Sequence, residues 1–185
     1  MVTKVLFELD EERAVRPTLG LVVLQADETI EDEFRAYLQG CDVVLHHTRV
    51  PSGEEVTHES LSAMEHQLEA AIRLFPTNTV FDVIGYACTS ASSVIGETKV
   101  SSLINRVYPE AVTTNPATAI KAAMASLGVA HPALLAPYTP ELASGIASML
   151  EAGGFQVSAL LTFDEEVEEK VARISPNSIL DGVIS

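Results

Sequence analysis

Short apolar runs alternate with helical segments along nearly the whole chain, and no other feature of the sequence constrains the fold as much. The runs that we predict to be strands cover residues 19–24, 42–47, 81–87, 111–114, 133–136 and 155–163. The segments between most of them are roughly ten to fifteen residues long and carry helical periodicity or helix-capping residues. This alternation predicts an α/β fold in which parallel strands are joined by right-handed crossovers.

Capping residues predict where several of the helices begin and end. Asp27 or Thr29 can cap the first helix, whose first turn is acidic, and Gly40 can end it. We predict further helices at residues 59–74, 97–107, 116–127, 140–151 and 165–174, and a last helical segment that opens at residues 175–176.

A second cycle of strands and helices begins at residue 111 and resembles the first. We therefore expect three parts: an N-terminal leader at residues 1–17, an N-terminal α/β lobe at residues 18–110, and a C-terminal α/β lobe at residues 111–185. With 185 residues and 47% hydrophobic content, the chain is long enough to bury one ample core or two small ones.

Charge and cysteine content exclude several classes of function. A formal net charge of −15 disfavours nucleic acid and anionic membranes as partners, because phosphate groups are bound by patches of Lys and Arg. We find no stretch of about 20 apolar residues and no signal-peptide pattern, so we expect a cytoplasmic protein. Cys41 and Cys88 cannot form a disulfide framework, and the sequence has no cluster with the spacing of metal ligands.

Cys88 is the candidate for chemistry, since it follows a buried strand directly and is itself followed by small polar residues. In parallel α/β sheets ligands bind beyond the carboxyl ends of the strands, where backbone N–H groups point outward. A helix start and hydroxyl donors near the thiol would favour the thiolate. The alternative is that Cys88 is a buried apolar filler, which is the usual role of a free cysteine.

Four segments resemble the aspartate/glutamate racemase superfamily, and within it the branch of maleate cis-trans isomerase, arylmalonate decarboxylase and the ectoine-utilisation protein EutA. They are Leu19–Glu31, Thr48–Pro51, Tyr86–Ser90 and Pro137–Thr139. The run Asp27–Glu31, together with the Thr-Arg-Val-Pro segment, is most similar to EutA. The resemblance covers nearly all of the chain.

The resemblance implies two pseudo-symmetric lobes with parallel sheets flanked by helices, and a cofactor-free site in the cleft between them. It also implies a homodimer. In racemase and isomerase members each lobe supplies one catalytic cysteine, and Cys88 matches the N-terminal one. Thr89 and Ser90 match residues that hold a substrate carboxylate, and Tyr138 matches a tyrosine that reaches the same group. Thr139 adjoins it in the motif and is also a candidate for substrate binding.

Two departures from the family pattern affect these expectations. Asp27 stands where maleate isomerase has an asparagine, and it would repel a substrate carboxylate unless it is protonated or paired, for example with Arg49. It is a candidate substrate contact and equally a helix cap. The sequence also ends at Ser185, before the strand that would carry a second cysteine motif, and Cys41 lies at the wrong end of its strand. We therefore expect an incomplete second lobe.

The remaining polar residues are expected to be structural. His46 and His47 are adjacent in a strand and point to opposite faces, so they cannot act as a pair. Residues 164–169 form an acidic run that we interpret as a solvated helix face, although the preceding strand end brings one carboxylate near the cleft.

We predict a cofactor-independent isomerase or racemase that acts on a small carboxylic acid through Cys88. Hydroxyls and amides around that carboxylate would stabilise the enediolate-like charge of the reaction. One alternative is a decarboxylase of the arylmalonate type. The other is a catalytically silent protein that binds a small acid.

Overall fold

The computed structural model describes residues 2–9 and 16–184, and its larger part is built around a four-stranded parallel sheet. Its strand order is β2-β1-β3-β4. The strands are β1 (Thr18–Leu24), β2 (Val44–Val50), β3 (Val83–Tyr86) and β4 (Val112–Thr114). β1 lies between β2 and β3, and its last five residues are all buried. This explains its continuous apolar sequence, since strands of parallel sheets are covered on both faces.

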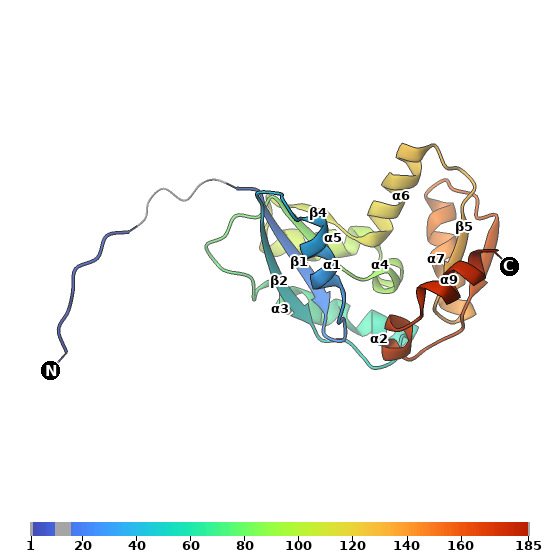
Figure 1. Cartoon of the computed structure of the whole chain (residues 1–185), viewed down its shortest axis with the longest axis horizontal. Coiled ribbons are helices and arrows are strands. Elements are labelled where there is room, and N and C mark those ends of the chain that lie inside the picture. Colours follow the sequence, from blue (N-terminus) through green and yellow to red (C-terminus); the bar gives the residue numbers. More distant parts are fainter. Residues whose placement is uncertain (1, 10–15, 185) are drawn as a thin grey trace.

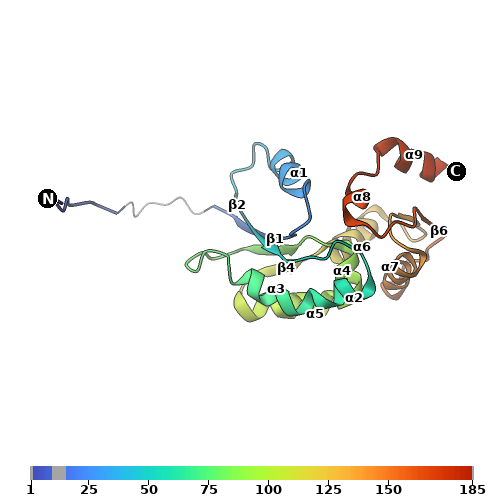
Figure 2. The same cartoon turned by 90° about the horizontal axis from the view of Figure 1, so that it is seen from below.

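Helices cover both faces of this sheet. Figure 2 shows α1 (Ile30–Tyr37) on one face, and α2 (His58–Ala63), α3 (Glu65–Ile72) and α5 (Glu97–Val107) on the other. The main core lies under the second group, where Leu68, Ile72 and Ile104 are fully buried against Ile84 of β3. Within the described residues, no helix combines the length and apolarity needed to cross a bilayer.

A smaller two-stranded parallel sheet follows, made of β5 (Ala133–Ala136) and β6 (Ala159–Thr162). Its helices are α6 (Pro116–Leu127), α7 (Pro140–Ala152), α8 (Glu168–Ala172) and α9 (Pro176–Ile184). Between the two sheets lies α4 (Thr89–Ile95), which contacts α2 on one side and α7 on the other (Figure 1). The chain therefore has the expected α/β class, with two parallel sheets flanked by helices.

Several of the predicted helix boundaries are confirmed. The side chain of Asn115 accepts the N–H of Thr118 at 3.0 Å at the start of α6, and Gly128 ends that helix with a φ of 69°. Thr139 caps α7, and Pro140 is its first residue. These boundaries depend on local backbone chemistry, so they can be read from the sequence.

Other expectations are wrong. The single helix at residues 59–74 is split into α2 and α3 at Met64, and the strand expected at residues 42–47 instead runs from Val44 to Val50. The strand at residues 111–114 pairs with β3 and completes the first sheet, whereas we expected it to open the second lobe. Of the helix expected at residues 165–174, only Glu168–Ala172 is helical. Part of the expected leader, residues 10–15, lies outside the described residues.

Candidate active site

Cys88 lies where β3 ends and α4 begins. It is the N-cap residue of α4, with extended backbone angles, and only 6% of its surface is exposed. Its Sγ accepts the N–H of Ala91 at 3.3 Å and lies 3.5 Å from Oγ of Ser90. The sulfur thus occupies the position of a capping oxygen, and it faces the first turn of the helix.

Burial raises the pKa of the Cys88 thiol. Hydrogen bonds from Ser90, from the N–H of Ala91 and from Tyr86 lower this pKa, whereas the charge of Glu168 raises it. Burial is the larger cause, so the donors that we expected to favour the thiolate do not outweigh it. A thiol in this site needs to lose its proton before it can act as a nucleophile.

The first turn of α4 offers two backbone donors beside the thiol. Among the described residues, the N–H groups of Thr89 and Ser90 have no hydrogen-bond acceptor, as expected for the first residues of a helix. The side chain of Ser90 is buried, and that of Thr89 is partly exposed. These two amides and the Thr89 hydroxyl therefore have no partner among the described residues and could bind an anionic group such as a carboxylate, whereas the Ser90 hydroxyl already contacts Cys88.

Tyr138 joins this group from the second part of the chain. It packs on the main core cluster, and its hydroxyl lies near Ser90. Burial, and after it the charge of Cys88, raises the pKa of Tyr138 to about 12, so that its hydroxyl stays a hydrogen-bond donor at neutral pH. Thr139 uses its hydroxyl as the cap of α7, accepting the N–H of Leu142 at 3.5 Å. The structure thus brings Cys88, Ser90 and Tyr138 together.

Asp27 acts as a helix cap in this structure. Its Oδ1 accepts the N–H groups of Thr29 and Ile30, both at 2.9 Å, whereas the side chain of Thr29 makes no cap hydrogen bond. Arg49 does not pair with the Asp27 carboxylate. Its guanidinium donates to the backbone carbonyls of residues 24, 25 and 27 and forms an ion pair with Glu31 at 2.7 Å.

Glu168 is not among the site residues predicted from the sequence, which indicates only that one carboxylate of the acidic run comes near the cleft. Glu168 is the first residue of α8, and it is partly buried at the strand-end edge of the first sheet. Burial, and after it the charge of Asp27, raises the pKa of Glu168. The charge of Glu168 in turn raises the pKa values of Cys88 and Tyr138. This carboxylate therefore belongs to the environment of the thiol.

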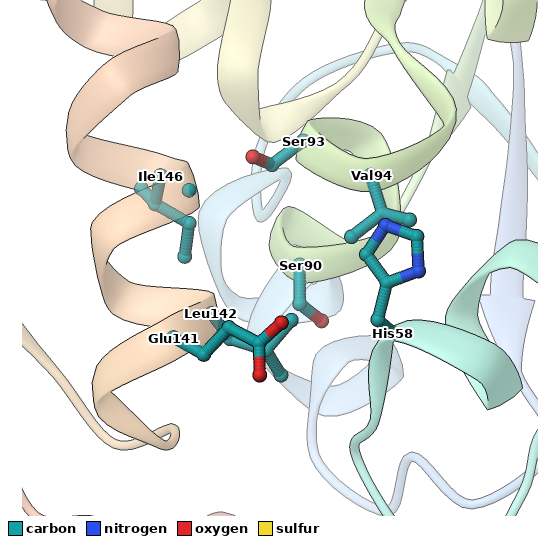
Figure 3. A pocket seen from close by; sticks show the side chains of 8 residues that line it. His58, Ser90, Ser93, Val94, Glu141, Leu142 and Ile146 are labelled. Atoms are coloured by element: carbon teal, nitrogen blue, oxygen red, sulfur yellow. The ribbon is translucent and has the colours of Figure 1, made fainter.

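Two hollows adjoin the group around Cys88. One of about 180 Å³ lies between α2, α4 and α7, where His58 and Glu141 lie on either side of Ser90 (Figure 3). The other, of about 620 Å³, lies at the strand ends and is lined by the loops after β1 and β2 and by α8, including Glu168. Ser90 lines the first hollow and Glu168 lines the second, and the buried Cys88 itself lines neither.

Other candidate residues lie away from this site. Cys41 is exposed before β2. His46 contacts the ring of Phe81, with ring centroids 5.6 Å apart, and Nε2 of His47 is buried on the other face without a hydrogen-bond partner among the described residues. In the part of the chain that the structure describes, no three His, Cys, Asp or Glu side chains are grouped to hold a metal ion.

Comparison with known proteins gives relatives that match this fold. No family model matches the chain. Maleate isomerase of Nocardia farcinica is 31% identical over an alignment of 150 residues, and the match covers 76% of this chain and 59% of the relative. The chain thus spans less than two thirds of that relative's length.

Solved structures extend the match over most of the chain. Nocardia farcinica maleate cis-trans isomerase, in a variant with a covalently bound succinylcysteine intermediate, superimposes with a TM-score of 0.82 and 27% identity. The match covers 92% of this chain and 73% of that one. A liganded variant of arylmalonate decarboxylase gives a TM-score of 0.74 at 20% identity, over 91% of this chain and 71% of its own, and so shows the fold alone. The chain is thus a homologue of maleate isomerase, and it shares with arylmalonate decarboxylase the fold that the resemblance to the aspartate/glutamate racemase superfamily implied.

Proposed function

We propose that this chain acts on a small carboxylic acid as a cofactor-independent isomerase in which Cys88 is the nucleophile. The observation that carries the proposal is the geometry around the thiol. Sγ lies 3.5 Å from the Ser90 hydroxyl and accepts the N–H of Ala91, beside two backbone N–H groups without an acceptor among the described residues. The maleate isomerase of Nocardia farcinica supports it, because that homologue has been observed with a cysteine-bound intermediate.

The substrate carboxylate would bind at the N–H groups of Thr89 and Ser90 and at the Tyr138 hydroxyl. In this position the alkene carbon that is β to the carboxylate can face Sγ. Binding of an alkenoic acid would replace water at these donors, which then hold negative charge as it develops on the carboxylate. Since burial raises the pKa of Cys88, the resting group is the neutral thiol, which loses its proton to solvent water before the attack and regains it after the thiolate is expelled.

The reaction then consists of the addition of the thiolate to the alkene, a rotation, and the elimination of the thiolate. The thiolate adds to the β carbon and forms an S–C bond, while the π electrons move to the α carbon and spread over the carboxylate as an enediolate. Rotation about the former double bond follows. Return of the electrons restores the alkene in the trans form and expels the thiolate, so no cofactor enters the balance.

Turnover of cis-alkenoic acids tests this proposal. We would follow maleate and isocrotonate by proton NMR with the native chain, with Cys88→Ser and with Cys41→Ser as the matched control. We expect the first variant to lower turnover by at least about a thousandfold and the second to leave it unchanged. Turnover that survives in Cys88→Ser would contradict the proposal, as would the absence of turnover with every acid.

A catalytically silent small-acid-binding protein is the second candidate, and the raised pKa of Cys88 favours it. A buried neutral thiol can line a binding site and donate a weak hydrogen bond to a ligand even where it does not react. In that case Cys88→Ser would keep the affinity for the acid, and no alkene would isomerise.

A further inference from the structure

Glu168 is fixed at the strand-end edge of the first sheet by backbone pairing with that sheet's own loop. The segment after β6 runs antiparallel to the segment after β2, and Glu55 and Val167 form a bridge between them. Next to the bridge, the N–H of Glu168 donates to the carbonyl of Glu54 at 3.0 Å. The backbone that carries this carboxylate is thus held by both parts of the chain.

Two of the other carboxylates of the acidic run are held in ion pairs. Glu165 forms an ion pair with Lys170 at 3.3 Å, and Glu169 forms one with Arg173 at 3.1 Å. Within residues 2–9 and 16–184, the Glu168 carboxylate accepts no hydrogen bond and forms no ion pair. The acidic run therefore leaves Glu168 available to the hollow that it lines.

The charge balance of this hollow is negative. Four carboxylate side chains line it, and its cation is Arg173, which pairs with one of the four. Asp27 lies close enough to Glu168 to raise its pKa, although burial is the larger cause. Arg49 forms no ion pair with either group among the described residues, because its guanidinium donates to loop carbonyls and pairs with Glu31.

We propose that Glu168, with Asp27 beside it, sets the charge specificity of the site by favouring a substrate that carries a cationic group as well as its carboxylate. The carboxylate would bind at the amides and hydroxyls beside Cys88, and an ammonium-type group would lie toward Glu168. A second carboxylate in that place would meet like charge without a compensating cation, which is how sites reject a wrong ligand. This inference rests on the proposed function, since it assumes that the carboxylate binds beside Cys88.

Three acids that share a four-carbon cis-alkene skeleton isolate the effect of charge. Maleate is a dianion, isocrotonate a monoanion and cis-4-aminobut-2-enoate a zwitterion. We would measure their dissociation constants for the full chain by titration calorimetry at pH 7.5. The zwitterion is expected to bind about fivefold more tightly than isocrotonate, and maleate about fivefold more weakly.

Glu168→Gln removes the charge and keeps the shape of the side chain, and Glu169→Gln is the matched control on the same helix. The first variant should bring the three dissociation constants within about twofold of one another, whereas the control should leave their order unchanged. Circular dichroism would verify that both variants are folded. The preference of the native chain tests the inference even where a variant does not fold.

The possible outcomes separate this inference from the proposed function. Equal or tighter binding of maleate to the native chain overturns the specificity role of Glu168 and leaves the carboxylate site in place. An unchanged order of affinities in Glu168→Gln does the same. Failure of all three acids to bind overturns both the inference and the proposed function.

Discussion

The two sheets of this chain differ in how far they are covered, although both are parallel and both are flanked by helices. In the first sheet the last five residues of β1 and the last three of β3 are buried. In the second, β5 buries only Ala136 and β6 buries no residue at all. The first sheet is therefore tightly packed and expected to be rigid, whereas the second is only partly covered and expected to be less stable locally.

Because of this difference, the residues of the candidate site are held in position in two different ways. Cys88, Thr89 and Ser90 follow β3 directly, so their positions are fixed by the well-packed sheet. Tyr138 and Glu168 come from the less covered part, and they reach the site because α7 packs on α4 and because the bridge at Val167 holds the loop. Cys88, the proposed nucleophile, is thus positioned by the core, whereas the side chains proposed to select the ligand are held by contacts between the two parts.

Truncating one strand residue in each sheet should show the largest difference between the sheets in the free energy of unfolding. Ile84 in β3 is fully buried, and Leu160 in β6 is 41% exposed. We expect Ile84→Ala to lower the free energy of unfolding by about 3 kcal/mol, because it leaves a cavity in the core, and Leu160→Ala to lower it by less than about 1 kcal/mol. Urea denaturation measures both. Equal losses would show that the second sheet is packed as tightly as the first.

Replacing a glycine by alanine should change the stability of the protein in opposite directions in the two parts. A Cβ on Gly20 in β1 would lie 3.1 Å from atoms of Ile84 and Phe75, whereas a Cβ on Gly145 in α7 meets nothing within 4 Å. Gly20→Ala should therefore destabilise the protein by about 1–3 kcal/mol through overpacking. Gly145→Ala should stabilise it by about 0.5–1 kcal/mol, since alanine is the better helix former. Thermal unfolding of both variants compares the signs, and a stabilising Gly20→Ala would refute the tight packing of β1.

A smaller effect is expected at the junction of the two parts. The pKa of Glu168 is raised in the folded chain above its ordinary value of 4.5, so its ionisation opposes folding as the pH rises through this range. Glu168→Gln should then increase the free energy of unfolding at pH 7 by a few tenths of a kcal/mol, and this gain should vanish below about pH 4. Denaturation at pH 4 and 7 tests the sign. Glu169→Gln, which loses its ion pair with Arg173, should show no gain.

The sequence predicts those parts of the fold that depend on local chemistry. The caps of α6 and α7 follow from Asn115-Pro116 and Thr139-Pro140, and the strand before Cys88 follows from its apolar run. The break at Met64 is not predictable from periodicity, because α2 and α3 bury the same apolar face on either side of it. The membership of β4 depends on pairing with a distant strand, which leaves no local signal in three residues.

The candidate site divides in the same way. Cys88 and its polar neighbours stand out because they follow a buried strand. Glu168 does not, because the five carboxylates of the acidic run look alike in the sequence and the bridge to Glu55 decides which carboxylate turns inward. The capping role of Asp27 was one of two expected alternatives, and its proximity to Glu168 depends on the same bridge.

The most direct test of the account is the alkylation of the two cysteines by iodoacetate and by iodoacetamide, with rates determined by peptide mass spectrometry at pH 8.5. The two reagents differ mainly in that iodoacetate carries a carboxylate, and the exposed Cys41 provides an internal reference within the same chain. Cys88 should react more slowly overall, because it is buried and its pKa is raised. If the amides and hydroxyls beside Cys88 hold a carboxylate, the ratio of the iodoacetate rate to the iodoacetamide rate should be about tenfold higher at Cys88 than at Cys41. An equal or lower ratio at Cys88 would contradict the carboxylate site on which the proposed function depends.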